Sequence, residues 1–142
     1  MTSLHSANAA EPLGPYAHAR RVGNLLFVAG IGPRVRGSRA IPGAKLDAGG
    51  NLIDYDFEAE MRSCFANIKT ILDESGFKWE HIVDVAAYLT DLKRDWSTYN
   101  RVYAEYFPQG PTQPTRTTVE VSALPTGGDT PIHFEVKVIA AL

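Results

Sequence analysis

The sequence contains one cysteine among its 142 residues, and this scarcity excludes two kinds of site. A lone thiol cannot form a disulfide within the chain, and it cannot complete a thiolate metal site. Sparse cysteine fits a reducing compartment, and the start of the chain has neither the basic nor the apolar region of a secretory signal. We therefore expect a cytoplasmic protein.

Long hydrophobic runs and an excess of one charge are also missing. No apolar stretch approaches the ~20 residues that a membrane-spanning helix needs. A net charge of −2 and a pI near 6.1 give no general reason to expect a nucleic-acid partner. We expect neither a membrane nor a nucleic acid as partner.

Several common catalytic motifs are absent as well. The chain has no P-loop, no Gly-x-Gly-x-x-Gly after a strand, and no Gly-x-Ser-x-Gly elbow. Its four histidines lack paired metal-ligand spacing: His5, His18, His81 and His133. We expect no metal and no cofactor. Two options remain, namely cofactor-free chemistry on an anionic small molecule, or binding without chemistry.

What is present fits one small globular domain, with 44% hydrophobic and 21% charged residues. We expect a loose N-terminal arm over residues 1–12 and a single domain over residues 13–142. A strand ending near Val22, the turn Gly23-Asn24 and a strand over 25–30 predict a hairpin. The second strand has no polar alternation, so we expect it to be covered on both faces.

The segment from Ile31 to about Asn51 is rich in Gly and Pro and is expected to be a loop. Its basic side chains either lie in solvent or reach a negatively charged ligand, and its single acid is Asp47. The basic residues are Arg34, Arg36, Arg39 and Lys45.

Helical spacing of apolar residues predicts a first helix between the N-cap Asp56 and Gly76, which stops it. Cys64 lies on the apolar stripe, so we expect a core residue rather than a nucleophile. A strand over 82–89 and a turn over 91–95 follow. A second helix then begins near Trp96, with Asp95 as its cap.

Two strands, within 114–125 and over 132–140, carry the candidate chemistry. Alternation puts Arg116, Thr118 and Glu120 on one face of the first, and His133, Glu135 and Lys137 on one face of the second. If the strands share a sheet, we expect Glu135 near Arg116, as an anion grip beside a carboxylate that handles water. A structural ion pair between Arg116 and Glu120 is the alternative.

The order of elements predicts an α+β fold with both helices on one face of a mixed sheet. The other face of the sheet is then left uncovered. Its apolar residues favour self-association, so we expect a homo-oligomer.

Six segments together resemble the reactive-intermediate deaminase (Rid, formerly YjgF) family from about residue 12 onward. They are Gly14-Pro15-Tyr16, Val28-Ala29-Gly30, residues 99–103 (Tyr-Asn-Arg-Val-Tyr), residues 114–121 around Arg116, Leu124-Pro125 and Phe134-Glu135-Val136. Within that family the chain is most similar to 2-aminomuconate deaminases, through Gly-Pro-Arg-Val-Arg-Gly-Ser at 32–38 and Tyr-Phe-Pro-Gln-Gly-Pro at 106–111.

The resemblance implies a chorismate-mutase-like fold, assembly into a homotrimer or hexamer, and clefts between neighbouring subunits. It also implies cofactor-free hydrolysis of enamines and imines with release of ammonia. Carried over by position, Arg116 anchors the substrate carboxylate and Glu135 positions the attacking water. The remaining substrate-binding positions are Tyr16, Gly30, Ile31, Asn100 and Thr118.

A 2-aminomuconate substrate has two carboxylates, and Arg116 can hold only one of them. We expect Arg34, Arg36 or His133 to address the second. Two other functions stay open: a general enamine or imine deaminase acting on small unsaturated amino acids, and a non-catalytic protein that binds ligands, assists folding or acts on RNA.

Overall fold

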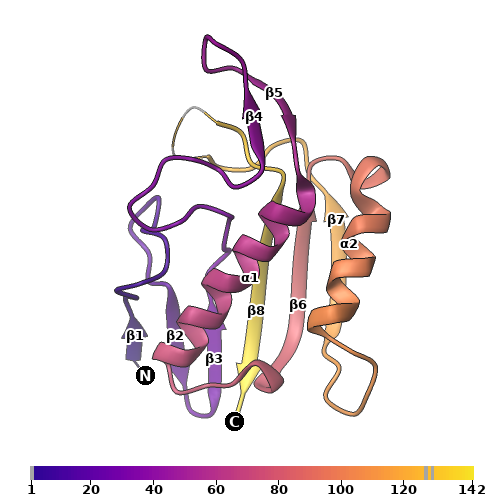
Figure 1. The fold of residues 1–142 in the computed structure, drawn as a ribbon. Helices are drawn as coiled ribbons and strands as arrows, with labels where there is room; N and C mark the ends of the chain where they lie inside the picture. Colours follow the sequence, from indigo (N-terminus) through magenta and orange to yellow (C-terminus); the bar gives the residue numbers. More distant parts are fainter. Residues whose placement is uncertain (1, 127, 129) are drawn as a thin grey trace.

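The computed structural model describes residues 2–126, 128 and 130–142, and it has two layers (Figure 1). Helices α1 (Phe57–Glu74) and α2 (Leu92–Tyr106) cover one face of a sheet with the order β1-β2-β3-β8-β6-β7. The sheet is mixed, because β6 and β7 run parallel and the other neighbours antiparallel. Its strands are Thr2–Leu4, Ala19–Val22, Leu25–Val28, Phe134–Ala141, Ile82–Leu89 and Thr115–Glu120 in that order. The expected α+β architecture is confirmed.

The N-terminal segment is more ordered than we expected. The loose arm over residues 1–12 is wrong for residues 2–4, because β1 pairs with β2. Ser6 and Ala9, which follow β1 in the chain, are buried. Small polar residues suggested disorder, but backbone pairing and hydrogen bonds to the body of the domain fix this segment.

The expected hairpin forms, with Gly23 at a φ of 60° in its turn. The segment 31–51 is not all loop, since β4 (Ala44–Leu46) pairs with β5 (Leu52–Tyr55) in a hairpin that projects beyond α1 (Figure 1). No residue of these two short strands is fully buried. Their sequences therefore do not show the alternation of apolar and polar residues by which a half-buried strand is predicted.

Helix α1 supplies the centre of the core and confirms its predicted ends. Asp56 accepts a hydrogen bond from the Ala59 amide, and Gly76 follows the helix with a φ of 79°. Cys64 is completely buried, and burial raises the pKa of its thiol. The thiol is therefore a core group, as expected.

Helix α2 begins earlier than expected. Its cap is Asp91, which accepts a hydrogen bond from the Arg94 amide, and Leu92 to Asp95 are helical rather than a turn. Asp95 is buried in the first turn and accepts a 2.6 Å hydrogen bond from the Tyr55 hydroxyl. Asp91 and Asp95 are one helical turn apart, and either could serve as an N-cap from the local sequence. The prediction chose Asp95 and so placed the start of the helix one turn too late.

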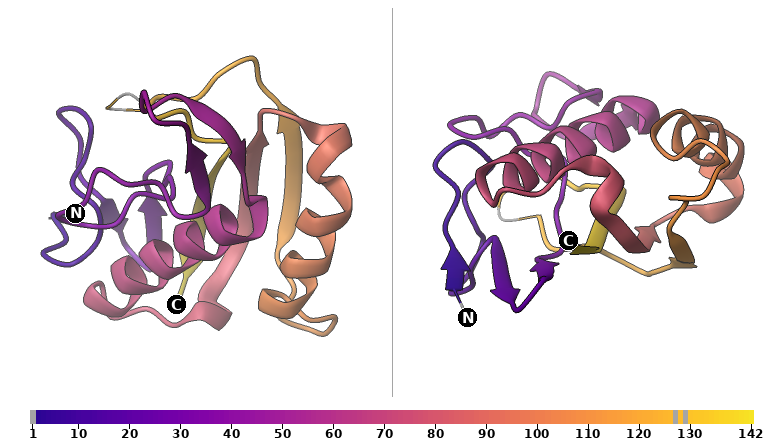
Figure 2. Two further views of the ribbon diagram at one scale, coloured as in Figure 1. Left: turned by 45° about the horizontal axis from the view of Figure 1, so that its top comes forward. Right: turned by 90° about the horizontal axis from the view of Figure 1, so that it is seen from below.

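The face of the sheet that points away from the helices has no covering layer (Figure 2). Phe27 is 38% exposed and Val119 is 40% exposed on it. The prediction that β3 is covered on both faces is therefore wrong for the single chain. An apolar sheet face of this kind favours self-association. No described helix is long and apolar enough to cross a membrane.

We expect Asp91→Ala to lower the free energy of unfolding by about 1 kcal/mol, because it removes the N-cap of α2. Urea unfolding measures the change, and Lys93→Ala is the control, since Lys93 is an exposed neighbour in the same turn. An unchanged free energy for Asp91→Ala would show that Asp91 does not cap the helix.

Candidate active site

Arg116 lies at the edge strand β7, with its guanidinium over the aromatic side of α2. It donates a 3.0 Å hydrogen bond to the Asn100 Oδ1 atom. Its central carbon lies 4.7 Å from the ring centre of Tyr103 and 5.0 Å from that of Tyr99. Stacking on aromatic faces stabilises a guanidinium while leaving donors at its rim. Arg116 is exposed, so those donors are available to a ligand.

The alternative of an ion pair between Arg116 and Glu120 is wrong. The Glu120 carboxylate accepts a 2.8 Å hydrogen bond from the Leu92 amide at the start of α2. A carboxylate is favourable there because the first amides of a helix lack partners and carry partial positive charge. Glu120 therefore has a structural role, and Arg116 keeps its charge free of a carboxylate among the described residues.

Glu135 lies in a hollow of about 410 Å³ at the start of β8. Gly30 packs directly against it, because a Cβ atom added at Gly30 would come within 2.5 Å of the Glu135 Oε2 atom. Only a residue without a side chain lets the carboxylate lie so close to the backbone after β3. The hollow also contains Tyr16, Ile31 and Arg34.

The Glu135 carboxylate has no hydrogen-bond or ion-pair partner among the described residues, although it is half-buried. Burial raises its pKa above the ordinary glutamate value. A carboxylate with a raised pKa, open to a hollow and free of partners, is suited to exchange protons with a bound molecule.

Within one chain, Arg116 and Glu135 do not meet. Strand β6 separates their strands, and Arg116 is paired with Val85 while Glu135 is paired with Tyr88. Val85 is buried under the helices, so Arg116 shares that face, whereas Glu135 alternates with the buried Val136 and points to the other. The expectation that a shared sheet would bring them together is wrong, because it ignored the strand between them.

Arg116 instead belongs to a second hollow, of about 430 Å³. It lies there with Asn100, Tyr103 and Phe107, so the structure brings Arg116 and Asn100 together. Thr118 lies two residues after Arg116 on β7 and therefore on the same face of the sheet. Its hydroxyl shares a 2.6 Å hydrogen bond with the Tyr99 hydroxyl. The described lining of this second hollow therefore holds a guanidinium but no carboxylate.

His133 does not join either hollow, although it is close to Glu135 in sequence. Its Nδ1 atom lies 2.7 Å from the fully buried carboxylate of Glu60, and its backbone amide donates to the same carboxylate. Its ring stacks on Tyr55 with 3.5 Å between ring centres. His133 therefore holds the residue that precedes β8 against α1, and it is not placed to contact a ligand beside Glu135.

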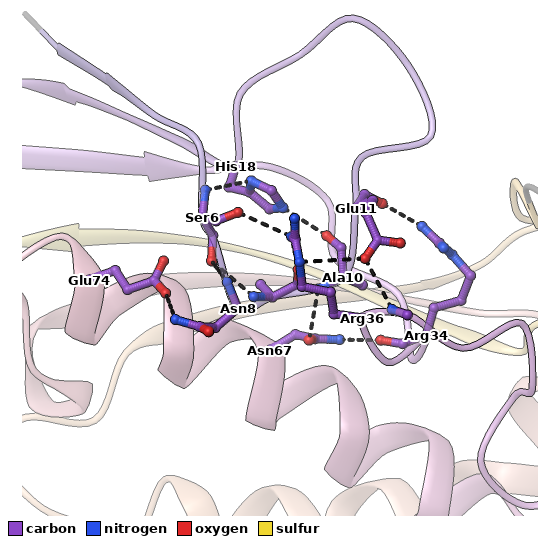
Figure 3. A network of polar contacts seen from close by, with 11 residues as sticks. Ser6, Asn8, Ala10, Glu11, His18, Arg34, Arg36, Asn67 and Glu74 are labelled. Carbon is purple, nitrogen blue, oxygen red and sulfur yellow. Dashed lines mark hydrogen bonds and ion pairs between the residues drawn. The ribbon is translucent and has the colours of Figure 1, made fainter.

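The wall of the Glu135 hollow includes residues that sequence reasoning missed. Residues 9–13 line it, together with His18 and Asn67. The buried His18 accepts a hydrogen bond from the Ser6 amide at Nδ1, so its proton is on Nε2, which lies 2.7 Å from the Ala10 carbonyl (Figure 3). No local motif signals this role, because it depends on contacts between distant segments.

Arg36 and Asn67 hold the same wall from the other side (Figure 3). Arg36 donates to the carbonyls of Ser6 and Ala9. Asn67, on α1, accepts from the Ala10 amide and donates to the Arg34 carbonyl at 2.7 Å. The hollow is thus built before any ligand arrives.

Comparison with known proteins identifies the family of this chain. Residues 6–142 match the family described as Endoribonuclease L-PSP. The chain is 36% identical over 140 residues to the RutC family protein PH0854 of Pyrococcus horikoshii, covering 96% of this chain and 94% of that one. The chain belongs to the Endoribonuclease L-PSP, or Rid, family.

Solved structures of this family share the whole fold. The Rid family protein YyfA of Yersinia pestis superimposes with a TM-score of 0.78 at 30% identity, over 99% of this chain and 98% of that one. Escherichia coli TdcF with bound serine superimposes with a TM-score of 0.79 at 26% identity, over 100% of this chain and 99% of that one. The family resemblance seen in the sequence is confirmed.

We expect Gly30→Ala to preserve the fold while moving Glu135, because the added methyl group meets only the flexible end of that side chain. Its free energy of unfolding should stay within about 1 kcal/mol of wild type. The displaced carboxylate loses its burial, so its pKa should fall toward the ordinary value. Urea unfolding and a carbon-13 NMR titration of the Glu135 carboxyl measure the two effects.

Gly43→Ala is the matched comparison. Gly43 has a φ of 80°, and a Cβ atom there would lie 2.8 Å from the Asp56 carbonyl oxygen. This variant should lose more stability than Gly30→Ala while leaving the Glu135 titration unchanged. An unaltered Glu135 titration in Gly30→Ala would contradict the close packing of the two residues.

Proposed function

We propose that this protein is a cofactor-independent hydrolytic deaminase of enamines and imines derived from amino acids. The observation that carries the proposal is Glu135, a half-buried carboxylate with a raised pKa and no partner among the described residues, at the wall of a preformed hollow. Arg116 supports it as an exposed guanidinium that has no carboxylate of its own among those residues.

In the proposed reaction, Arg116 holds the substrate carboxylate through two hydrogen bonds, and the enamine tautomerises to an imine. Glu135 accepts a proton from water, and the oxygen attacks the carbon of the C=N bond. The tetrahedral adduct receives a proton on nitrogen, the C–N bond breaks, and ammonia leaves with a 2-oxo acid. One water is consumed, so no oxidant, metal or other cofactor is required.

The site needs a second copy of the chain, because one chain holds Arg116 and Glu135 in separate hollows on opposite faces. We infer a homotrimer in which the uncovered sheet faces pack together and the edge of β7 reaches the Glu135 hollow of a neighbour. The exposed apolar residues of that face support this assembly. Each cleft then combines Arg116 and Asn100 of one subunit with Glu135 and Tyr16 of the next.

For the substrate, we propose 2-aminomuconate, which would yield 4-oxalocrotonate (2-oxohex-3-enedioate) and ammonia in aromatic catabolism. A general deaminase of 2-aminoacrylate-type intermediates is the alternative. The serine bound to TdcF, named above, is a small amino acid, and this favours the alternative. The rates of ammonia release from the two freshly generated compounds distinguish them.

A function on RNA has less support, although the matching family is described as an endoribonuclease. A net charge of −2 gives little attraction to a phosphate backbone. Of the aromatic residues beside Arg116, Tyr99 and Tyr103 are buried and only Trp96 is exposed, so they offer little surface for stacking successive bases.

We expect Glu135→Gln to lower the rate of ammonia release by at least about 100-fold, because glutamine cannot accept a proton from water. Its free energy of unfolding at pH 7 should not fall below that of wild type. A carboxyl whose folded pKa is raised contributes stability only at low pH and loses it as pH rises through that pKa. The variant therefore removes a buried charge that is unfavourable at pH 7.

A coupled ammonia assay and urea unfolding measure these two properties. The acid limb of the wild-type pH–rate profile should lie above the ordinary glutamate range, because Glu135 must lose its proton to act. Glu105→Gln, an exposed glutamate of α2, is the control and should keep full activity. Full activity in Glu135→Gln would end the proposed mechanism.

Mixing two inactive variants tests the shared site. Arg116→Ala and Glu135→Gln should each be inactive, but co-refolding equal amounts should give mixed assemblies in which about one site in four has both groups intact. Activity near a quarter of wild type is therefore expected. No recovery in assemblies shown by mass spectrometry to be mixed would place both groups in the same chain's site.

A further inference from the structure

Arg34 has an unusual electrostatic position. It is half-buried, yet the one hydrogen bond of its side chain among the described residues goes to the carbonyl oxygen of Glu11. A guanidinium has five N–H donors and a full charge, so a single neutral acceptor leaves most of its capacity unused. A partly buried cation without an anion is costly, and such a group is expected where an anion binds.

Other arginines of the chain differ from Arg34 in this respect. Arg62 and Arg101 pair with glutamates, at 2.7 Å and 2.6 Å. Arg94 pairs with Asp54 at 3.1 Å, and Arg36 lies 3.7 Å from the carboxylate of Glu11. Their charges are therefore compensated within the chain.

Arg34 lies where two hollows adjoin. It lines the Glu135 hollow, and it also lines a neighbouring hollow of about 360 Å³ with Ser38 and Arg39. Arg39 also has no carboxylate within 4 Å among the described residues. Two guanidinium groups without a carboxylate partner among the described residues, together with a hydroxyl, therefore border the end of the cavity that Arg34 shares.

Glu11 borders both hollows too, but its charge is already compensated. Its carboxylate accepts a 3.1 Å hydrogen bond from the Gly37 amide and lies beside Arg36. It contributes only its backbone carbonyl to Arg34. The described side chains that face this junction therefore carry a net positive charge.

The backbone that carries Arg34 is held firmly on α1. Asn67 donates to the carbonyls of Gly32 and Arg34, at 3.2 Å and 2.7 Å, and the Ser63 hydroxyl donates to the Pro33 carbonyl at 2.7 Å. Both donors come from buried or half-buried positions of a long helix. A charged group on such a support loses little entropy when it binds a ligand.

We propose that Arg34 and Arg39 form an anion subsite that binds the distal carboxylate of a substrate whose amino-bearing carbon lies beside Glu135. The inference rests on the proposed deaminase function and names its substrate class as unsaturated amino dicarboxylates. Of the three residues considered for the second carboxylate, His133 is occupied by Glu60 and Arg36 by Glu11 and two carbonyls. Arg34 alone of the three combines access to the Glu135 hollow with an uncompensated charge.

Calorimetry with unreactive acids tests the subsite without catalysis. Wild-type protein should bind adipate, a saturated six-carbon dicarboxylate, at least about tenfold more tightly than hexanoate, because a charge-assisted hydrogen bond is added. Arg34→Gln should abolish this difference, and Arg34→Lys should restore part of it. Equal binding of the two acids by wild type, or unchanged preference in Arg34→Gln, would overturn the proposal.

The matched control is Arg21→Gln, since Arg21 also donates to one backbone carbonyl, that of Gly23, but lies outside the hollows. It should keep the preference for adipate. Inorganic phosphate is a second probe, and tighter binding of phosphate than of adipate would overturn the assignment to a carboxylate.

Kinetics separate this inference from the proposed function. In Arg34→Gln, the KM for 2-aminomuconate should rise at least about tenfold with little change in kcat, while turnover of 2-aminoacrylate, which has no distal carboxylate, should fall much less. If wild type releases ammonia from neither compound, the deaminase proposal fails, and the calorimetry still decides whether the subsite exists. Ammonia release without any effect of Arg34→Gln on either compound refutes the subsite alone.

Discussion

The candidate site depends on keeping the Glu135 carboxylate partly buried and without a partner among the described residues. Burying Glu135 without a hydrogen-bond donor is unfavourable, so the surrounding chain must hold it there. Gly30 leaves the space, the bridge between Ile31 and Val136 fixes the backbone on both sides, and residues 9–13 close the wall. His18 and Asn67 anchor that wall through main-chain groups. The stability lost at Glu135 is thus offset by the hydrogen bonds of the surrounding wall, which also include those from Arg36 to the Ser6 and Ala9 carbonyls.

The alternation of side chains between the two faces of the sheet sets the second constraint on the site. Because side chains alternate along a strand, the face on which a residue lies is fixed once its strand pairing is fixed. Arg116 pairs with a residue under the helices, and Glu135 pairs with one on the open face. No change of rotamer moves either group through the sheet. A reaction that needs both groups therefore needs another copy of the chain, and the uncovered face provides a surface on which a copy can pack.

Elements with a strong periodic pattern were predictable from sequence. The stripe of α1, its Asp56 cap and the strand with alternating Phe134, Val136 and Val138 follow from local spacing. The predictions that were wrong concerned residues whose contacts are with segments far away in the sequence. The order of strands placed β6 between the two candidate strands, and Asp95 became a buried partner of Tyr55 rather than a cap. The identity of Arg116 and Glu135 as a pair came from family resemblance, since neither residue type is distinctive on an isolated strand.

The residues proposed to act on the first carboxylate and the C=N bond, Arg116 and Glu135, differ from Arg34, proposed for the second carboxylate, in how the fold holds them. Arg116 lies on an edge strand and Glu135 on a central strand, and the register of the whole sheet fixes the positions of both. Arg34 lies in an irregular segment that is held by the bridge between Ile31 and Val136 and by hydrogen bonds to Ser63, Asn67 and the N-terminal residues. A loop attached in this way can change sequence while the sheet stays intact. The chemistry of the site is therefore tied to the fold, whereas the second anion contact is a local property of residues 31–51. Relatives with the same sheet and a different loop should share the grip on the first carboxylate and differ in what they accept beyond it.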